Sequence, residues 1–456
     1  MLFSRSVVTA VAGFVLLIST CLQVEAFETD PDSGIHTFEL KNGMDALVVE
    51  DHRLPLVVQV VLYFVGAADE GVGETGIAHF LEHLTFRAVG RDIGVPLGEL
   101  VSRYGGKLNA TTSLDSTNYF EMVPVQYLEN VMDIESRRMG QLNLLQKDFD
   151  TEKQVVIQER KMRVDGDIFG QVREYIQASA FINHPYRRPV IGWMHEIKAL
   201  SLEEVRHFYG QYYSPSNSVL IVVGDVEPAA VEKMARKYYG KISSKNRGGS
   251  NEKTARPEEP EVSFSRHLKG KSSMVAQSAL FRSYTIPTFL GAGAYKEAAT
   301  IGILMQALCG GKSSLMYEML VFQEGVADYV ECDYTFEKDY GQLLFYVVKA
   351  TDSSNDDIAE MMDKAINEAF TLKYLRQDIV DAAKNVVKAE FYRQKDDILG
   401  RALGYALFLK AGADVHELHK WPAYIDAVTL QDVQDSLKKY PREENSVSFF
   451  LETEDE

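Results

Sequence analysis

The 456-residue chain is poor in cysteine, in tryptophan and in basic residues relative to acidic ones. Three cysteines are too few for the disulfide framework on which small secreted domains depend. A net charge of −18, from 48 basic and 66 acidic residues, argues against nucleic acid as the main partner, because nucleic acid is itself a polyanion. Beyond the N-terminal segment, no stretch is long and apolar enough to cross a bilayer. The composition is otherwise that of a globular protein, and the length predicts at least two domains.

Residues 1–26 have the pattern of a secretory signal peptide. Arg5 precedes the apolar run 7–18, and the segment 24–26 offers short side chains at the two positions that a signal peptidase reads. An alternative is a lipoprotein attached through Cys21, but the residues before Cys21 fit that pattern poorly. We therefore expect a periplasmic or secreted protein with no membrane span after cleavage.

Cleavage after residue 26 would leave two cysteines, Cys309 and Cys332. An oxidising compartment would permit a disulfide between them. They could equally be small buried residues, and the sequence does not distinguish these alternatives.

The second half of the chain repeats the first. The only two tryptophans, Trp193 and Trp421, are 228 residues apart, and the same offset maps Asn217-Ser218-Val219 onto Asn445-Ser446-Val447. A period of this length indicates two related domains rather than a solenoid of small units. Short strands alternate with helical stretches in each half, and several strands are joined by hairpins. This pattern predicts the α+β class, with two homologous domains that each pack helices on a mostly antiparallel sheet.

The motif His79-Phe80-Leu81-Glu82-His83 places two histidines four residues apart, with a glutamate beside the second. On a helix these side chains share one face, so two imidazoles can reach one metal ion. A catalytic zinc takes three protein ligands and one water, and a nearby carboxylate can act as general base. The order is the inverse of His-Glu-x-x-His and is itself a recognised zinc-peptidase motif. The alternative is a polar helix face, but apolar flanking residues make that costly without a partner.

The third ligand is expected on the predicted helix 150–163. This helix carries Glu152 and Glu159 seven residues apart and hence on one face. The similar helix 375–392 of the second half has Ala389 opposite Glu159. The carboxylate is therefore confined to the half that has the histidines. Glu159 is the predicted ligand, and Glu152 is predicted to orient a histidine. Without the histidine motif, both would be interpreted as exposed helix charges.

These residues resemble the pitrilysin/insulinase family, M16, of zinc metallopeptidases, and in particular the short bacterial members related to mitochondrial processing peptidase. Supporting segments are Phe64–Glu70, Gly105-Gly106, His184-Pro185-Tyr186 and Gly224-Asp225-Val226. The resemblance covers most of the mature chain. It implies that His79, His83 and Glu159 bind Zn²⁺ and that Glu82 is the general base.

The resemblance also implies a chamber, between two halves or two subunits, in which a peptide adds a strand to a sheet edge. Asn109 and Ala110 resemble that edge, within a segment, Asn109–Tyr119, that we expect to be one strand. Members that act alone carry an Arg and a Tyr in the second domain. Here Leu315 stands where the Arg is expected, and Tyr329 and Tyr334 are candidates for the Tyr. We therefore expect a homodimer, or a heterodimer with a related M16 subunit.

The domain organisation follows from the repeat, the motif and the polar segment between the halves. We predict a signal peptide at 1–26, an N-terminal zinc-binding peptidase domain at 27–243, a linker at 244–262 and a homologous inactive domain at 263–456. The predicted function is that of a zinc metalloendopeptidase that cleaves peptides or unfolded segments inside a chamber. The alternative is an M16-like binding or scaffold subunit with little activity alone. A structural zinc site would need a fourth protein ligand, which no nearby cysteine supplies.

Overall fold

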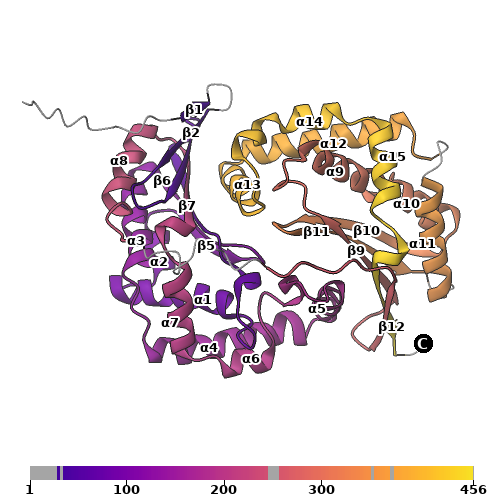
Figure 1. The fold of residues 1–456 in the computed structure, drawn as a ribbon, viewed down its shortest axis with the longest axis horizontal. Coiled ribbons are helices and arrows are strands. Elements are labelled where there is room, and N and C mark those ends of the chain that lie inside the picture. Colours follow the sequence, from indigo (N-terminus) through magenta and orange to yellow (C-terminus); the bar gives the residue numbers. More distant parts are fainter. Residues whose placement is uncertain (1–27, 31–33, 245–255, 351–353, 370–373, 455–456) are drawn as a thin grey trace, which may run out of the picture.

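The computed structural model describes residues 28–30, 34–244, 256–350, 354–369 and 374–454 (Figure 1). The predicted signal peptide, Cys21 and most of the predicted linker lie outside these residues. Among the helices of the described residues, none combines the length and the apolar composition that a membrane span requires.

The first half contains a seven-stranded sheet with the strand order β1-β2-β3-β7-β4-β6-β5. Its strands are β1 (Glu28–Asp30), β2 (Ile35–Glu39), β3 (Asp45–Glu50), β4 (Leu56–Tyr63), β5 (Lys107–Thr112), β6 (Thr117–Pro124) and β7 (Ser218–Gly224). Its helices are α1 (Ile77–Ile93), α2 (Leu97–Arg103), α3 (Leu128–Gly140), α4 (Gln146–Arg160), α5 (Ile168–Ala180), α6 (Met194–Ala199), α7 (Leu202–Tyr212) and α8 (Pro228–Tyr238).

The second half contains a five-stranded sheet with the strand order β10-β11-β9-β12-β8. Its strands are β8 (Arg266–Ser272), β9 (Ala279–Pro287), β10 (Ala327–Phe336), β11 (Tyr340–Lys349) and β12 (Ser446–Thr453). Its helices are α9 (Tyr295–Cys309), α10 (Leu315–Tyr317), α11 (Asn355–Ala369), α12 (Gln377–Asp396), α13 (Ile398–Lys410), α14 (Trp421–Ala427) and α15 (Leu430–Lys439).

The two sheets have the same topology. The order β5-β6-β4-β7-β3 in the first sheet corresponds to β10-β11-β9-β12-β8 in the second. Pairing is antiparallel except for β3 with β7 and its counterpart, β8 with β12. The predicted α+β fold of two homologous, mostly antiparallel domains is therefore confirmed. The last helix of the first half ends at Tyr238 and the second sheet begins at Arg266; the domain boundaries themselves stay predictions.

The expectation of one strand over Asn109–Tyr119 was wrong. The segment forms the hairpin of β5 and β6, and the turn between them is closed by the N–H of Ser113, which donates to the carbonyl of Ser116 at 2.8 Å. Threonine and serine favour strands and turns alike, so composition did not locate the turn. The consequence is that β5 lies at the edge of the sheet and, within the part of the chain that the structure describes, pairs with β6 alone.

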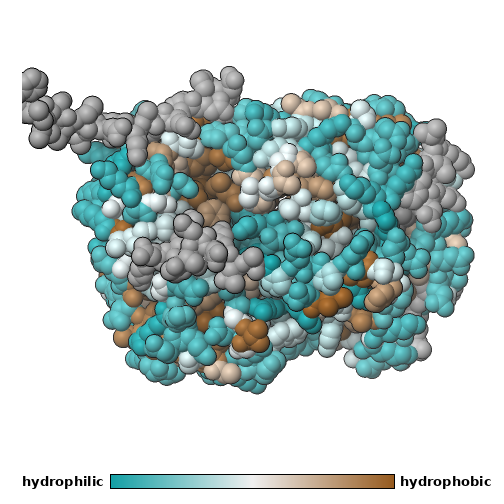
Figure 2. Space-filling model, viewed as in Figure 1, coloured by the Kyte–Doolittle hydropathy of each residue, from teal (hydrophilic) through white to brown (hydrophobic). Residues whose placement is uncertain are grey.

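One helix of each half packs against the sheet of the other half. Helix α5 of the first half buries Val172 and Ile176 against the second sheet, in one cluster with Phe281 of β9 and Phe449 of β12. Its counterpart α13 packs against β4 and β7 of the first sheet (Figure 1). Figure 2 shows a mainly hydrophilic face, on which apolar residues gather between the two halves. Besides the core within each half, two apolar clusters therefore contain residues of both halves.

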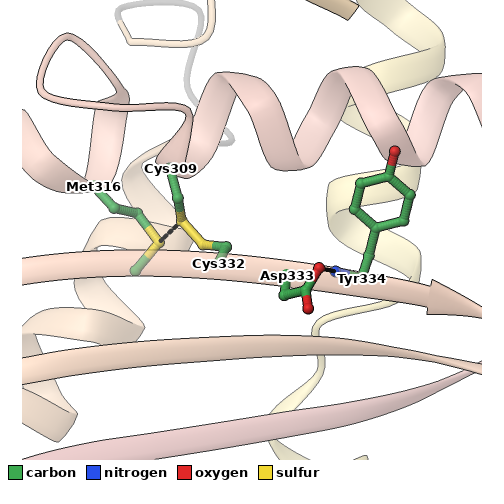
Figure 3. Close-up of a disulfide and its surroundings, with 5 residues drawn as sticks. All are labelled: Cys309, Met316, Cys332, Asp333 and Tyr334. Carbon is green, nitrogen blue, oxygen red and sulfur yellow. Dashed lines mark hydrogen bonds between the residues drawn. A yellow bond between two sulfur atoms is a disulfide. The ribbon is translucent and has the colours of Figure 1, made fainter. Parts of the chain in front are cut away.

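Cys309, at the end of α9, and Cys332, in β10, form a disulfide with a Cα–Cα distance of 5.5 Å (Figure 3). The thioether sulfur of Met316 lies 3.7 Å from Sγ of Cys309. Of the two alternatives that the sequence left open, the structure thus has the paired cysteines. The bridge closes a loop that holds α10 and the start of the edge strand β10.

The double variant Cys309→Ser/Cys332→Ser should have a free energy of unfolding about 3 kcal/mol lower than the wild type, because the bridge restricts the unfolded chain across a 23-residue separation. Urea denaturation with and without a reductant measures this. The reductant should destabilise the wild type and leave the variant unchanged. Two free thiols in the oxidised, denatured wild type would contradict the prediction.

The variant Ile176→Ala should lower the free energy of unfolding by about 2–5 kcal/mol, because it removes a buried side chain from the surface that both halves share. Arg173→Ala is the matched control, since Arg173 lies on the exposed face of the same helix. Urea denaturation of both variants tests the prediction. Equal midpoints would contradict it.

Candidate metal centre

Helix α1 is fixed at its N-terminus by a buried carboxylate. The preceding Gly76 has φ of 88°, and a Cβ there would lie 2.5 Å from the carbonyl oxygen of Ile191, so the position requires glycine. The Glu70 carboxylate accepts hydrogen bonds from the N–H groups of Gly76 and Ala78, both at 3.0 Å. Burial raises the pKa of Glu70 well above its usual value. Resemblance pointed to the segment that contains Glu70 but not to this role.

The start of α1 and the end of α4 bring three possible metal ligands together. Oε2 of Glu159 lies 3.0 Å from Nε2 of His83 and 3.7 Å from Nε2 of His79. One ligand atom from each of the three side chains lies within 4.8 Å of the others. Among the described residues, no other cluster of three or more His, Cys, Asp or Glu side chains meets this criterion.

The three side chains fit a zinc ion. Oε2 of Glu159 is buried and accepts no hydrogen bond of regular geometry within the described residues, although two imidazoles face it. A cation between these groups would satisfy that oxygen. Two imidazole nitrogens and one carboxylate oxygen make up the three-ligand set of a catalytic zinc, which leaves a fourth position for water.

The contact between α1 and α4 continues beyond the three residues as a row of paired polar side chains. His79, His83, Arg87 and Arg91 follow one another at four-residue spacing on α1. Arg87 pairs with Glu152, and Arg91 pairs with Asp148. On the core side of the same contact, the rings of Phe80 and Phe149 pack edge to face with centroids 5.0 Å apart. The helices are therefore held by a polar row and an apolar row, which together fix the histidines against Glu159.

Glu152, which the sequence predicts to orient a histidine, has its Oε2 3.7 Å from Nδ1 of His83. The motif did not predict Arg87, which pairs with the same carboxylate; its four-residue spacing from His83 is the signal that could have indicated it.

The two imidazoles differ in their electrostatic surroundings. Burial, reinforced by the neighbouring His83, lowers the pKa of His79 to about 4. Burial also acts to lower the pKa of His83, but the carboxylates of Glu152 and Glu159 outweigh it and raise that pKa to about 9. At neutral pH without metal, His79 is neutral and His83 is protonated. Metal binding through both rings therefore has to release a proton from His83.

Glu82 is buried on the same helix, with 9% of its surface exposed. Burial raises its pKa, and a hydrogen bond from the hydroxyl of Thr112, at 2.6 Å from Oε2, acts in the opposite direction. A raised pKa suits a group that accepts a proton near neutral pH. Thr112 was not predicted from the sequence, because nothing in the threonine-rich segment distinguishes it from its neighbours.

The predicted substrate-binding positions lie on the edge strand β5, which ends at Thr112. Asn109 is exposed, whereas the side chain of Ala110 is buried. In the second half, Leu315 is buried in the core, and Tyr329 and Tyr334 on β10 are 43% and 37% exposed. Of these three, only the tyrosines present their side chains at the surface.

Comparison with known proteins gives the family. Residues 51–193 match the model described as Insulinase (Peptidase family M16), and residues 199–387 match the model described as Peptidase M16 inactive domain. The chain belongs to peptidase family M16. The second M16 model begins at residue 199, although β7 and α8 belong to the first half of the structure.

The M16 relatives include proteins named as zinc proteases. The zinc protease PqqE of Helicobacter pylori is 28% identical over 417 residues, which are 90% of this chain and 91% of that protein. A crystal structure of a protease from Helicobacter pylori has a TM-score of 0.81 with 25% identity, covering 92% of this chain and 99% of that one. The first half of the periplasmic protease PqqL from Escherichia coli shares the fold, with a TM-score of 0.74, 19% identity, and coverage of 94% and 93% of the two chains.

The variant Glu159→Gln should weaken zinc binding by more than about 100-fold, because it removes the anionic ligand oxygen, and Glu152→Gln should weaken it by about 10–100-fold through the loss of its contact with His83. Zinc per chain and competition with a chelator measure both effects. His195→Ala is the control, because the side chain of His195 is 80% exposed. Wild-type zinc affinity in Glu159→Gln would contradict the assignment.

Proposed function

We propose that this M16 chain is a zinc metalloendopeptidase in which His79, His83 and Glu159 hold the zinc ion and Glu82 is the general base. The observation that carries the proposal is the position of Glu82, a buried carboxylate on the same helix as two imidazoles that face Glu159. The relatives named as zinc proteases support the same chemistry.

Each residue of the candidate site has a separate role in the proposed peptide hydrolysis. A zinc ion held there would polarise the peptide carbonyl and lower the pKa of a bound water. Glu82 takes the proton from the attacking water and delivers it to the leaving amine. Thr112 donates a hydrogen bond to the carboxylate of Glu82, and Arg87 pairs with Glu152, which lies beside the ring of His83. Each of these groups is fixed before substrate binds, so little reorganisation accompanies the reaction.

The proposed substrates are peptides or unfolded segments, bound as an added strand along β5. The outer side of β5 is free of strand pairing within the described residues. Backbone pairing at such an edge reads main chain more than sequence. The segment at Asn109 and Ala110 leads directly to Thr112, so a strand bound there would run past Glu82.

The proposed location is the periplasm or the cell exterior. The disulfide between Cys309 and Cys332 fits an oxidising compartment, and the segment 1–26 has a signal-peptide pattern. The structural neighbour PqqL is described as periplasmic.

We propose that the chain works as a homodimer or with a related M16 subunit. A second candidate function is a binding or scaffold subunit with little activity alone, which Leu315, in place of the expected Arg, would favour. The joint presence of His79, Glu82, His83 and Glu159 favours the enzyme, because a silent subunit has no need of all four.

Glu82→Gln should retain zinc and lose at least about 10²–10⁴-fold in kcat/KM, because the general base is removed while the ligands remain. Cleavage of an internally quenched peptide mixture, together with zinc analysis, tests this. Glu203→Gln, at a side chain that is 86% exposed, is the matched control. Zinc-loaded wild type that cleaves nothing, alone or with a related subunit, would favour the binding subunit instead.

A further inference from the structure

The two halves meet at an ionic group that we call the Arg256 cluster, formed by Arg256, Asp69, Asp115, Asp339 and Tyr186, of which Asp115 and Tyr186 are buried. The Arg256 guanidinium pairs with Asp69 at 2.8 Å, with Asp339 at 2.7 Å and with Asp115. Asp69 and Asp115 belong to the first half and Asp339 to the second. Removing the arginine would leave three carboxylates close together, with His184 still 3.2 Å from Asp339 but Asp69 and Asp115 without this ion pair, which is costly for a group that is at least partly buried.

The backbone of the second half takes part in the same cluster. The N–H of Lys338 donates to Oδ2 of Asp115 at 2.9 Å, and the N–H of Asp339 donates to the Tyr186 hydroxyl at 3.0 Å. That hydroxyl in turn donates to Asp115. Lys338 and Asp339 form the turn between β10 and β11, and Asp115 lies in the turn between β5 and β6. The corresponding hairpins of the two halves are thus joined turn to turn.

The β5–β6 turn leads directly to the proposed base. Thr112 is three residues before Asp115, and its hydroxyl donates to Glu82. The intervening backbone is held as well, because the N–H groups of Ala67 and Ala68 donate to the carbonyls of Ser113 and Leu114 at 3.0 and 2.8 Å. Asp69, the residue after Ala68, also pairs with Arg256, so the arginine contacts both segments of this pairing, 67–69 and 113–115.

We infer that the second half positions the Glu82 carboxylate: the Arg256 cluster fixes the β5–β6 turn, and the turn fixes the hydroxyl of Thr112. This inference rests on the proposed function. Thr112 and Arg256 are positioning residues, since both act through Glu82: Thr112 donates to its carboxylate, and Arg256 holds the turn that follows Thr112. The half without the histidine motif would thus contribute to the chemistry as well as to the fold.

Thr112→Val should lower kcat by about 10–100-fold and leave KM and zinc content unchanged, because the base is misplaced while the binding strand and the ligands remain. Thr112→Ser, which retains a hydroxyl, should restore most of kcat. Arg256→Met should lower kcat by about 10-fold. The double variant Thr112→Val/Arg256→Met should be no slower than Thr112→Val alone, because both changes act through one carboxylate.

Arg401→Met is the matched control. Arg401 is also a half-buried arginine that joins the halves, through an ion pair with Asp51 directly after β3. That strand lies four positions from β5 in the sheet, roughly 19 Å away at the usual strand spacing. This variant should lose stability and keep kcat. Wild-type kcat in Arg256→Met, or independent, multiplicative losses in the double variant, would overturn the inference.

Hydrogen exchange in the metal-free chain gives a test that does not depend on activity. Amides of residues 113–116 should exchange faster in Arg256→Met than in the wild type or Arg401→Met, and a crystal structure of Arg256→Met should show Thr112 and Glu82 beyond hydrogen-bond distance. If the wild type proves inactive, the proposed function fails, and these two measurements still decide whether the cluster holds Thr112 on Glu82. Unchanged exchange and an unchanged Thr112–Glu82 hydrogen bond would overturn the inference.

Discussion

The packing of α1 against α4 is the contact on which the candidate site depends. Four side chains at four-residue spacing on α1 face three carboxylates on α4, and the Phe80–Phe149 contact lies on the core side. The outer pairs are ordinary ion pairs, which hold the two helices in register. At the inner end, imidazoles replace the guanidinium groups, and Oε2 of Glu159 is left buried without a regular hydrogen bond, while its Oε1 pairs with Arg163. The same row of contacts thus serves structure at one end and is suited to a metal at the other.

The two halves have the same fold, but the first half alone carries the candidate metal ligands. Both halves have the same strand order, but α9 has no histidine and α12 has Ala389 opposite Glu159. The second half nevertheless packs closely against the first. Helix α13 covers the first sheet, α5 covers the second, and two half-buried arginines, Arg256 and Arg401, form ion pairs between the halves. Because each sheet is covered partly by the other half, loss of one half would expose apolar surface on the other.

Several features of the site followed from local sequence. The spacing of His79 and His83, and of Glu152 and Glu159, fixed which side chains share a helix face, because helical geometry is periodic. The repeat gave the architecture, since an offset that holds over many residues requires two similar units. The extent of β5 did not follow, because threonine and serine suit both strands and turns, and only pairing with β6 decides where the strand ends.

The sequence by itself determined the two-domain α+β fold and the pattern of histidines and carboxylates. The fold follows from the constant offset of the repeat, and the pattern follows from the spacing of residues along single helices. Tertiary structure alone decided which partners meet across long separations. The pairing of Cys309 with Cys332, the hydroxyl of Thr112 on Glu82 and the three carboxylates around Arg256 each join residues from different elements. Such contacts depend on how sheets and helices pack in space, and no periodicity in the sequence records that packing.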